Sequence, residues 1–173
     1  MITKPSQNEC SPYQWNYISL VPQTNDLLGE LQVQLIDTID LVTSLDDNTL
    51  LSAYAPGKWT IQEILVHLMD CERILAYRAL CIARNDQTEL PGFDENFYAA
   101  NSGANQRKIL GLVKEYSLLR ASTIELFQSF TEEMWNHKGT ANKQIIGVNT
   151  LAYMICGHEI HHRNVIEERY IGK

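Results

Sequence analysis

Three of the five histidines in this 173-residue sequence lie together in the segment His158-Glu-Ile-His-His162. Side chains four residues apart on a helix are neighbours on one face, so His158 and His162 can bind one metal ion together. Both fall in the apolar stripe of their segment, where imidazoles without a metal need buried hydrogen-bond partners. The spacing therefore favours a metal site over two packed core histidines. His161, three residues after His158, is an alternative ligand that periodicity alone does not exclude.

A third candidate ligand, His67, lies at the edge of the apolar stripe of another helical segment. It lies about 10 Å from the start of that segment, and His162 lies about 12 Å from the end of its own. The two side chains meet at one level if the two helices are antiparallel. Three histidine ligands leave coordination positions open for water or substrate, which is typical of catalytic zinc rather than structural zinc.

Two acidic side chains next to these histidines are candidates for supporting roles. Asp70, one turn after His67, and Glu159, directly after His158, can orient a ligand or a metal-bound water. Asp70 is otherwise a helix-surface carboxylate. Cys71 can be a soft fourth ligand, although a free buried thiol is the more common case. The catalytic residues are otherwise unknown from the sequence.

Other residues are candidates for contacts with a substrate. Arg73 and Arg78 can bind a substrate carboxylate, and surface ion pairs with Glu72 are the alternative, which we favour. The segment 91–96 can act as a lid or simply be a well-packed loop. Trp59 is interpreted as a core anchor rather than a platform for a ligand.

The segment from His158 to His162 also matches the H-E-x-x-H pattern of zinc proteases, in which Glu159 would be the general base. Such proteases take their third ligand downstream, yet only 11 residues follow His162. The extended form of the motif needs Gly and His where this chain has Val165 and Glu168. We therefore rank a zinc metalloprotease well below the other functions.

Four segments with helical periodicity must position these side chains, and none shows sustained strand alternation. They are predicted at about 24–45, 60–84, 105–130 and 148–170. Thr60 and Glu63 form a capping box that predicts where the second segment starts, and Asn85 is a plausible stop. The predicted fold is all-α, a four-helix bundle in one domain spanning residues 1–173, with residues 1–20 as an N-terminal extension.

The connection between the second and third segments, Asn85 to Ala104, is long for a compact domain. A chain of about 20 residues can travel back along a helix of about 36 Å, so the second and third helices can run parallel. An ordinary up-down-up-down bundle does not need such a connection.

Composition limits the partners. The chain has 14 Lys and Arg against 21 Asp and Glu, a net charge of −7. This charge and the absence of a basic cluster disfavour nucleic acid. No stretch has the roughly 20 apolar residues of a membrane span, and no signal peptide is evident. Four cysteines without a CxxC pair suggest reduced thiols and a cytoplasmic location. We expect a small-molecule substrate, no nucleic acid and no membrane partner, and leave a homodimer open.

Four strings in this order resemble the DinB/YfiT-like family: Tyr-Ala-Pro-Gly-Lys-Trp-Thr (54–60), His-Leu-Met-Asp-Cys-Glu-Arg (67–73), Leu-Pro-Gly-Phe-Asp-Glu-Asn (90–96) and Gly-His-Glu-Ile-His-His (157–162). The resemblance covers about residues 27–170. It implies an up-down-down-up four-helix bundle with a long crossover between helices 2 and 3. It also implies a metal, often zinc or nickel, bound by His67, His158 and His162, and so favours His162 over His161.

The resemblance implies a metal-dependent enzyme that acts on a small molecule, either a hydrolase or a thiol-dependent S-transferase. A divalent metal would be the cofactor, joined in a transferase by a low-molecular-weight thiol. The alternative is a non-catalytic, stress-associated metal-binding protein. The count of three ligands favours catalysis, since structural zinc usually has four protein ligands.

Overall fold

The computed structural model describes residues 2–172 and is mostly helical. The four long helices are α2 (Leu27–Thr43), α4 (Ile61–Ala83), α6 (Ile109–Gln128) and α8 (Val148–Arg169). The short helices are η1 (Gln7–Glu9), α1 (Pro12–Ile18), α3 (Asp47–Leu50), α5 (Glu95–Asn101), η2 (Ala104–Gln106) and α7 (Glu132–Trp135). Strands β1 (Lys138–Ala141) and β2 (Gln144–Gly147) form a hairpin. All four predicted helices are present, each boundary within four residues of its prediction.

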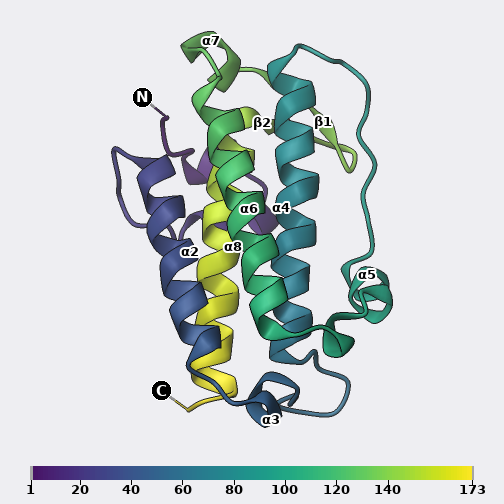
Figure 1. Ribbon diagram of the computed structural model, residues 1–173. Coiled ribbons are helices and arrows are strands. Elements are labelled where there is room, and N and C mark those ends of the chain that lie inside the picture. The colour runs from purple at the N-terminus through teal and green to yellow at the C-terminus, as the bar shows by residue number, and fades with distance from the viewer. Residues whose placement is uncertain (1, 173) are drawn as a thin grey trace.

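The four long helices form a bundle in which α4 and α6 run parallel (Figure 1). The chain between them, residues 84–108, returns along the side of α4 and carries α5 and η2. Helices α2 and α8 run in the opposite direction to α4 and α6. The predicted up-down-down-up topology with a long crossover is therefore confirmed, and it places α4 antiparallel to its main packing partner α8.

The ends of α4 follow local signals in the sequence. The backbone N–H of Glu63 donates to the Thr60 hydroxyl at 3.1 Å, and the Thr60 N–H donates to the Glu63 carboxylate at 2.7 Å. This capping box satisfies two of the free donors at a helix start. At the other end Asn85 adopts a φ of 64°, the left-handed conformation that stops many helices. Both predicted boundary signals of α4 are confirmed.

The N-terminal extension contains helix α1, which packs against α8. A Cβ atom at Gly157 would lie 2.1 Å from the carbonyl oxygen of Tyr17, so glycine is required for this close approach. The sequence did carry a signal for α1, because Ser11 and Gln14 form a capping box around Pro12 at the first helical position. Residues 12–18 are thus part of the packed structure beside His158.

The β-hairpin directly before α8 is not among the elements predicted from the sequence. Asn142 and Lys143 have φ values of 50° and 61°, which suit the two-residue turn that joins β1 to β2. Strands of four residues are too short for the alternation of side chains to be read from sequence. The hairpin lies against the C-terminal half of α4, where Gly139 faces Ile82. It therefore fixes the point at which α8 begins.

The bundle core consists of two apolar clusters with polar side chains between them. One cluster holds the N-terminal parts of α2 and α8, and the other holds their C-terminal parts. Each long helix contributes a buried polar side chain where the clusters meet: Gln34, Glu72, Arg120 and Glu159. The middle of this bundle is a polar layer. The side chains that could take part in chemistry lie in or beside this layer.

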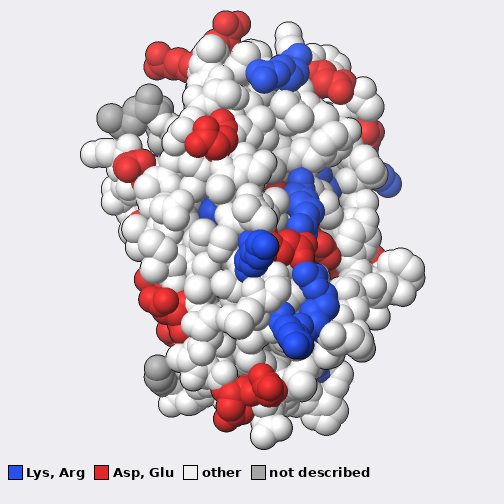
Figure 2. All heavy atoms as spheres, in the orientation of Figure 1, with Lys and Arg blue, Asp and Glu red and all other residues white. Residues whose placement is uncertain are grey.

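On the face that carries α4 and α6, Lys and Arg side chains gather near the middle, next to acidic side chains (Figure 2). Arg73 pairs with Asp70 and Glu115, and Arg107 also pairs with Glu115. No helix within residues 2–172 is long and apolar enough to cross a membrane.

Candidate metal centre

Three imidazoles converge between α4 and α8. Nε2 of His158 lies 3.0 Å from Nε2 of His67 and 3.1 Å from Nε2 of His162. His67 comes from the first half of α4, and the other two come from successive turns in the second half of α8. Because the helices are antiparallel, these positions fall at one level. We call His67, His158 and His162 the histidine cluster.

Burial sets the protonation state of the histidine cluster. His67 and His158 are 6% and 8% exposed. Burial lowers the pKa of His67 to about 4, and that of His162 to about 2 with a further contribution from neighbouring histidines. Burial and the neighbouring imidazoles also hold the pKa of His158 well below its usual range. All three rings are therefore neutral near pH 7, which is the state that binds metal ions.

The donor set and its spacing fit a divalent cation. Three nitrogens bound to one ion at about 2.0–2.1 Å in tetrahedral geometry lie about 3.4 Å apart. The observed spacings of 3.0 and 3.1 Å are close to this value. A neutral imidazole has a single ring lone pair, so His158 Nε2 cannot accept hydrogen bonds from both neighbours. A shared ion satisfies all three Nε2 atoms at once.

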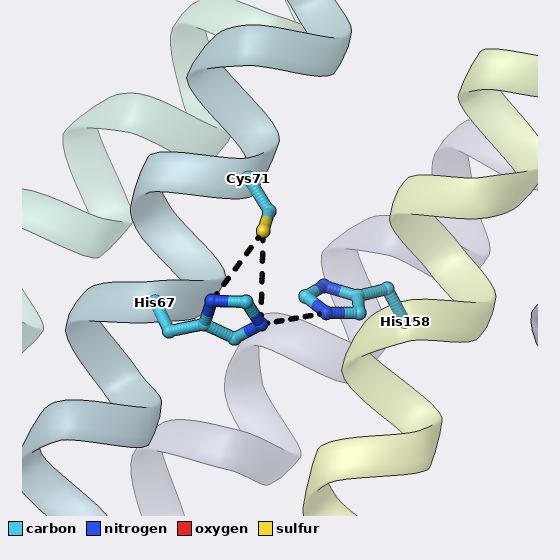
Figure 3. Close-up of side chains that lie close together, drawn as sticks. All are labelled: His67, Cys71 and His158. Atoms are coloured by element: carbon cyan, nitrogen blue, oxygen red, sulfur yellow. Dashed lines mark hydrogen bonds between the residues drawn. The ribbon is translucent and has the colours of Figure 1, made fainter. Parts of the chain in front are cut away.

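A fourth donor, the Cys71 thiol, lies beside this cluster. Its sulfur is 3.6 Å from Nδ1 and 3.7 Å from Nε2 of His67 (Figure 3). The donor atoms of His67, Cys71 and His158 all lie within 4.8 Å of one another. Burial raises the pKa of the Cys71 thiol strongly, which keeps the sulfur protonated unless a cation binds it. The structure thus places Cys71 near enough for either of its two predicted roles.

Aromatic rings surround the three imidazoles. The Trp59 ring centre lies 4.6 Å from that of His67, and Tyr17 on α1 packs edge-on to His158 at 5.3 Å. Tyr17 packs in the same way on His161 at 5.5 Å. His161 itself is only half-buried, and its ring packs edge-on to that of His162 with the ring centres 4.9 Å apart. The rings of Trp59 and Tyr17 restrict the orientations that the imidazoles can adopt.

The histidine cluster opens into a cavity of about 520 Å³. Its walls come from α1, α4, α8 and the crossover, including Gly92, Phe93, Glu95 and Asn96. The crossover segment therefore lies along the side of the bundle, where it forms one wall of the cavity beside the histidines. A cavity of this size accommodates a small organic molecule.

Comparison with known proteins agrees with this architecture. The model of the DinB superfamily matches residues 30–166. The chain belongs to the DinB superfamily. Among solved structures, YfiT from Bacillus subtilis, described as a probable metal-dependent hydrolase with an unusual four-helix bundle topology, matches with a TM-score of 0.71. The match has 18% sequence identity and covers 96% of this chain and 90% of that chain, so it shows a shared fold. A search of curated proteins finds no match.

The two acidic candidates lie away from the imidazole nitrogens of this DinB-superfamily chain. Asp70 is partly exposed and pairs with Arg73 at 3.6 Å. Glu159 is 1% exposed and accepts hydrogen bonds from Thr38 at 2.7 Å and Arg120 at 2.8 Å. A carboxylate held in this way is not placed as the general base that the H-E-x-x-H pattern requires.

Arg120 is the centre of a polar cluster that the sequence did not reveal. Its guanidinium is fully buried and donates to both Glu72 oxygens, to Glu159, to the Tyr116 hydroxyl and to the Leu31 carbonyl. We call Arg120, Glu72, Glu159, Tyr116 and Thr38 the arginine cluster. The favoured surface pairs of Glu72 with Arg73 and Arg78 are wrong, because Glu72 is buried against Arg120.

The fifth histidine has a role in the fold. Nδ1 of His137 lies 3.2 Å from the carbonyl oxygen of Ala83 at the end of α4, in the segment just before β1. Such a contact satisfies one of the free carbonyls that end a helix. His137 therefore lies at the opposite end of α4 from His67. It is not a ligand candidate for the histidine cluster.

Proposed function

We propose that this chain is a metal-dependent enzyme that hydrolyses a small molecule, with zinc or nickel bound by His67, His158 and His162. The observation that carries the proposal is the convergence of three neutral imidazole nitrogens, 3.0 and 3.1 Å apart, on the wall of a 520 Å³ cavity. Imidazole donors suit both metals. Three protein ligands would leave at least one coordination position for water or a substrate.

The chain's own groups would contribute binding and orientation. The bound ion would act as a Lewis acid that lowers the pKa of a water or thiol and so supplies a nucleophile near neutral pH. Binding of the ion through the three Nε2 atoms would leave the ring proton of each histidine on Nδ1. Trp59 and Tyr17 pack on the rings and limit the access of bulk water to them.

The proposed partner is a small molecule, because the cavity beside the histidines has the size of a small-molecule site. The proposed location remains the cytoplasm, as expected from the cysteine pattern. A low-molecular-weight thiol in place of water would turn the same site into a transferase, so both reactions belong in the test.

The test starts with elemental analysis of untagged protein, where we expect one zinc or nickel ion per chain. The metal-loaded protein is then assayed on a panel of esters, amides and pairs of a thiol with an electrophile. We expect turnover of one substrate class, loss of activity on chelation and recovery when the metal is restored. Helical circular dichroism should survive chelation, because a core of this size does not need the ion to fold.

A matched pair of variants gives the control. His162→Ala removes a ligand and should abolish both metal binding and activity. His161→Ala changes the neighbouring histidine and should retain both. Activity that survives complete removal of the metal would refute the proposal, and unfolding on chelation would favour the structural-metal alternative.

A further inference from the structure

Arg78 on α4 is a largely buried cation that forms no ion pair within the described part of the chain, with Glu95 as the acidic residue on the same cavity wall. Its side chain is 9% exposed, and none of the ion pairs within residues 2–172 includes it. Its Nη2 donates to the Pro91 carbonyl at 2.7 Å, and the guanidinium carbon lies 6.0 Å from the centre of the Phe93 ring. One neutral acceptor leaves most of the five N–H donors of an arginine available. A buried charge that forms no ion pair is unfavourable, so Arg78 is a candidate for binding an anionic ligand.

Arg78 lines the same cavity as the histidine cluster. His67, Cys71, Leu75 and Arg78 follow one another along one face of α4, and all four line the cavity. Eleven residues on a helix span about 16 Å, and a long side chain leans back toward the helix start, so the guanidinium lies on the order of 10 Å from the histidines. A single small molecule can reach both.

The cavity wall is mixed, with polar residues such as Asn96, Asn142 and Gln144 and a group of apolar and aromatic side chains. Leu75, Met154 and Phe93 line it together with the rings of Tyr13 and Tyr17. Arg78 is the only Lys or Arg among the described residues that line it, and Glu95 places a negative charge on the same wall. One guanidinium beside one carboxylate suits a singly charged anion better than a phosphate, which usually needs more positive charge. A planar guanidinium also matches a carboxylate with two parallel hydrogen bonds.

We propose that Arg78 binds the carboxylate of an elongated substrate whose reacting group lies at the histidine cluster and whose apolar middle packs on Leu75, Met154 and Phe93. The inference rests on the proposed function and adds the substrate class: small amphiphilic carboxylates. Burial lowers the pKa of Arg78, yet an arginine remains charged at neutral pH. Arg78 is therefore positively charged at the pH values at which the histidines are neutral and can bind a metal ion.

The test uses bifunctional probes on the zinc-loaded protein. Each probe carries a hydroxamate, which binds zinc, and an alkyl chain of increasing length that ends in a carboxylate or in the matching primary amide. Affinities are measured by isothermal titration calorimetry for the wild type, Arg78→Gln, Arg78→Lys and Arg73→Gln. Arg73 is the matched control, since it lies on the same helix but pairs at the surface. Glutamine at position 78 retains a donor for the Pro91 carbonyl.

At the best chain length we expect the carboxylate probe to bind the wild type about tenfold more tightly than its amide. The ratio should fall to about one in Arg78→Gln, take an intermediate value in Arg78→Lys and stay unchanged in Arg73→Gln. Equal binding of the two probes by the wild type, or an unchanged preference in Arg78→Gln, overturns the carboxylate site while the metal site stands. If no hydroxamate binds the zinc-loaded protein, the proposed function fails and this inference fails with it.

Discussion

The histidine cluster and the arginine cluster are two buried polar groups built from the same pair of helices. Helix α4 supplies His67 to one and Glu72 to the other, and α8 supplies the adjacent residues His158 and Glu159. In the arginine cluster every charged atom has a partner, with five hydrogen bonds from Arg120 to carboxylate and hydroxyl oxygens. In the histidine cluster, Nε2 of His158 lies within hydrogen-bond distance of two other Nε2 atoms but has only one lone pair or one proton to offer them. In addition, Nδ1 of His162 is buried without a hydrogen-bond partner.

This difference separates a structural role from a binding role. A satisfied network in a closed interior rigidifies the fold and has nothing left to offer a ligand. The Nε2 atoms of the histidine cluster, in contrast, converge beside a cavity. They are all satisfied only when a ligand such as a metal ion binds them. Because adjacent residues on a helix point about 100° apart, His158 and Glu159 lie on different faces of α8, and variants can remove one cluster and leave the other in place.

The largest expected effect is on stability, from Arg120→Met. The substitution leaves the Glu72 and Glu159 carboxylates buried without their counter-ion, and breaking a buried pair in this way costs about 3–5 kcal/mol. Urea unfolding measures the loss. Arg73→Met removes an exposed ion pair and should cost less than about 1 kcal/mol. Equal losses in the two variants would remove the distinction between the clusters.

His158→Ala should have the opposite pattern, with a large effect on metal binding and a small one on the fold. Even groups that only support a ligand change metal affinity by about 10–100-fold, so losing the central ligand should weaken binding by more than about 100-fold. Competition with a coloured chelator measures the affinity. The metal-free variant should unfold at no lower urea concentration than the metal-free wild type, because the Nε2 atom that both neighbouring imidazoles crowd has been removed. A marked loss of metal-free stability would make His158 a structural residue.

The pH dependence of the metal-free protein sharpens the contrast. The pKa of His67 is about 4 in the folded chain against an ordinary value of 6.5, so the unfolded chain binds the proton first as the pH falls. Stability is therefore lost from about pH 6.5 down to about pH 4. Urea unfolding of chelated protein at successive pH values measures the slope. His67→Ala should make the decline shallower in this window, and an unchanged slope would contradict the assignment.

The smallest expected effect is that of Cys71→Ser. As a buried thiol with a raised pKa, Cys71 is not needed to bind the ion, so metal content should stay at one per chain and stability should change by less than about 1 kcal/mol. Elemental analysis and urea unfolding give the two values. A clear fall in metal affinity would instead identify Cys71 as the fourth ligand.

The sequence predicts the parts of this molecule that depend on local signals. The capping box at Thr60, the stop at Asn85 and the i, i+4 spacing of His158 and His162 each act within one or two helical turns. Helix α1 has a comparable local signal in its Ser11 and Gln14 capping box, although the predicted helices do not include it.

Other features depend on contacts between distant segments. Arg120 follows Tyr116 by four residues along the buried stripe of α6, but only its partners on other helices make its burial possible. Arg73 and Arg78 are nearer to Glu72 in the sequence than Arg120 is. Proximity along the chain therefore predicts the wrong ion-pair partner for Glu72. The position of Arg78 in the cavity likewise depends on the crossover, whose path no local pattern specifies.

The ligands of the proposed metal site are far apart in the chain, since 91 residues separate His67 from His158. In a zinc finger the ligands are local, and the ion drives the folding of a short segment. Here the second and third ligands lie on the last helix, and the site exists only once α8 has docked on α4. A ribosome synthesises a chain from its N-terminus, so a nascent chain would have no metal site until α8 has been made and has docked on α4. Loading of the proposed metal would therefore follow the docking of α8, and a cell short of the ion would accumulate folded apoprotein rather than unfolded chains.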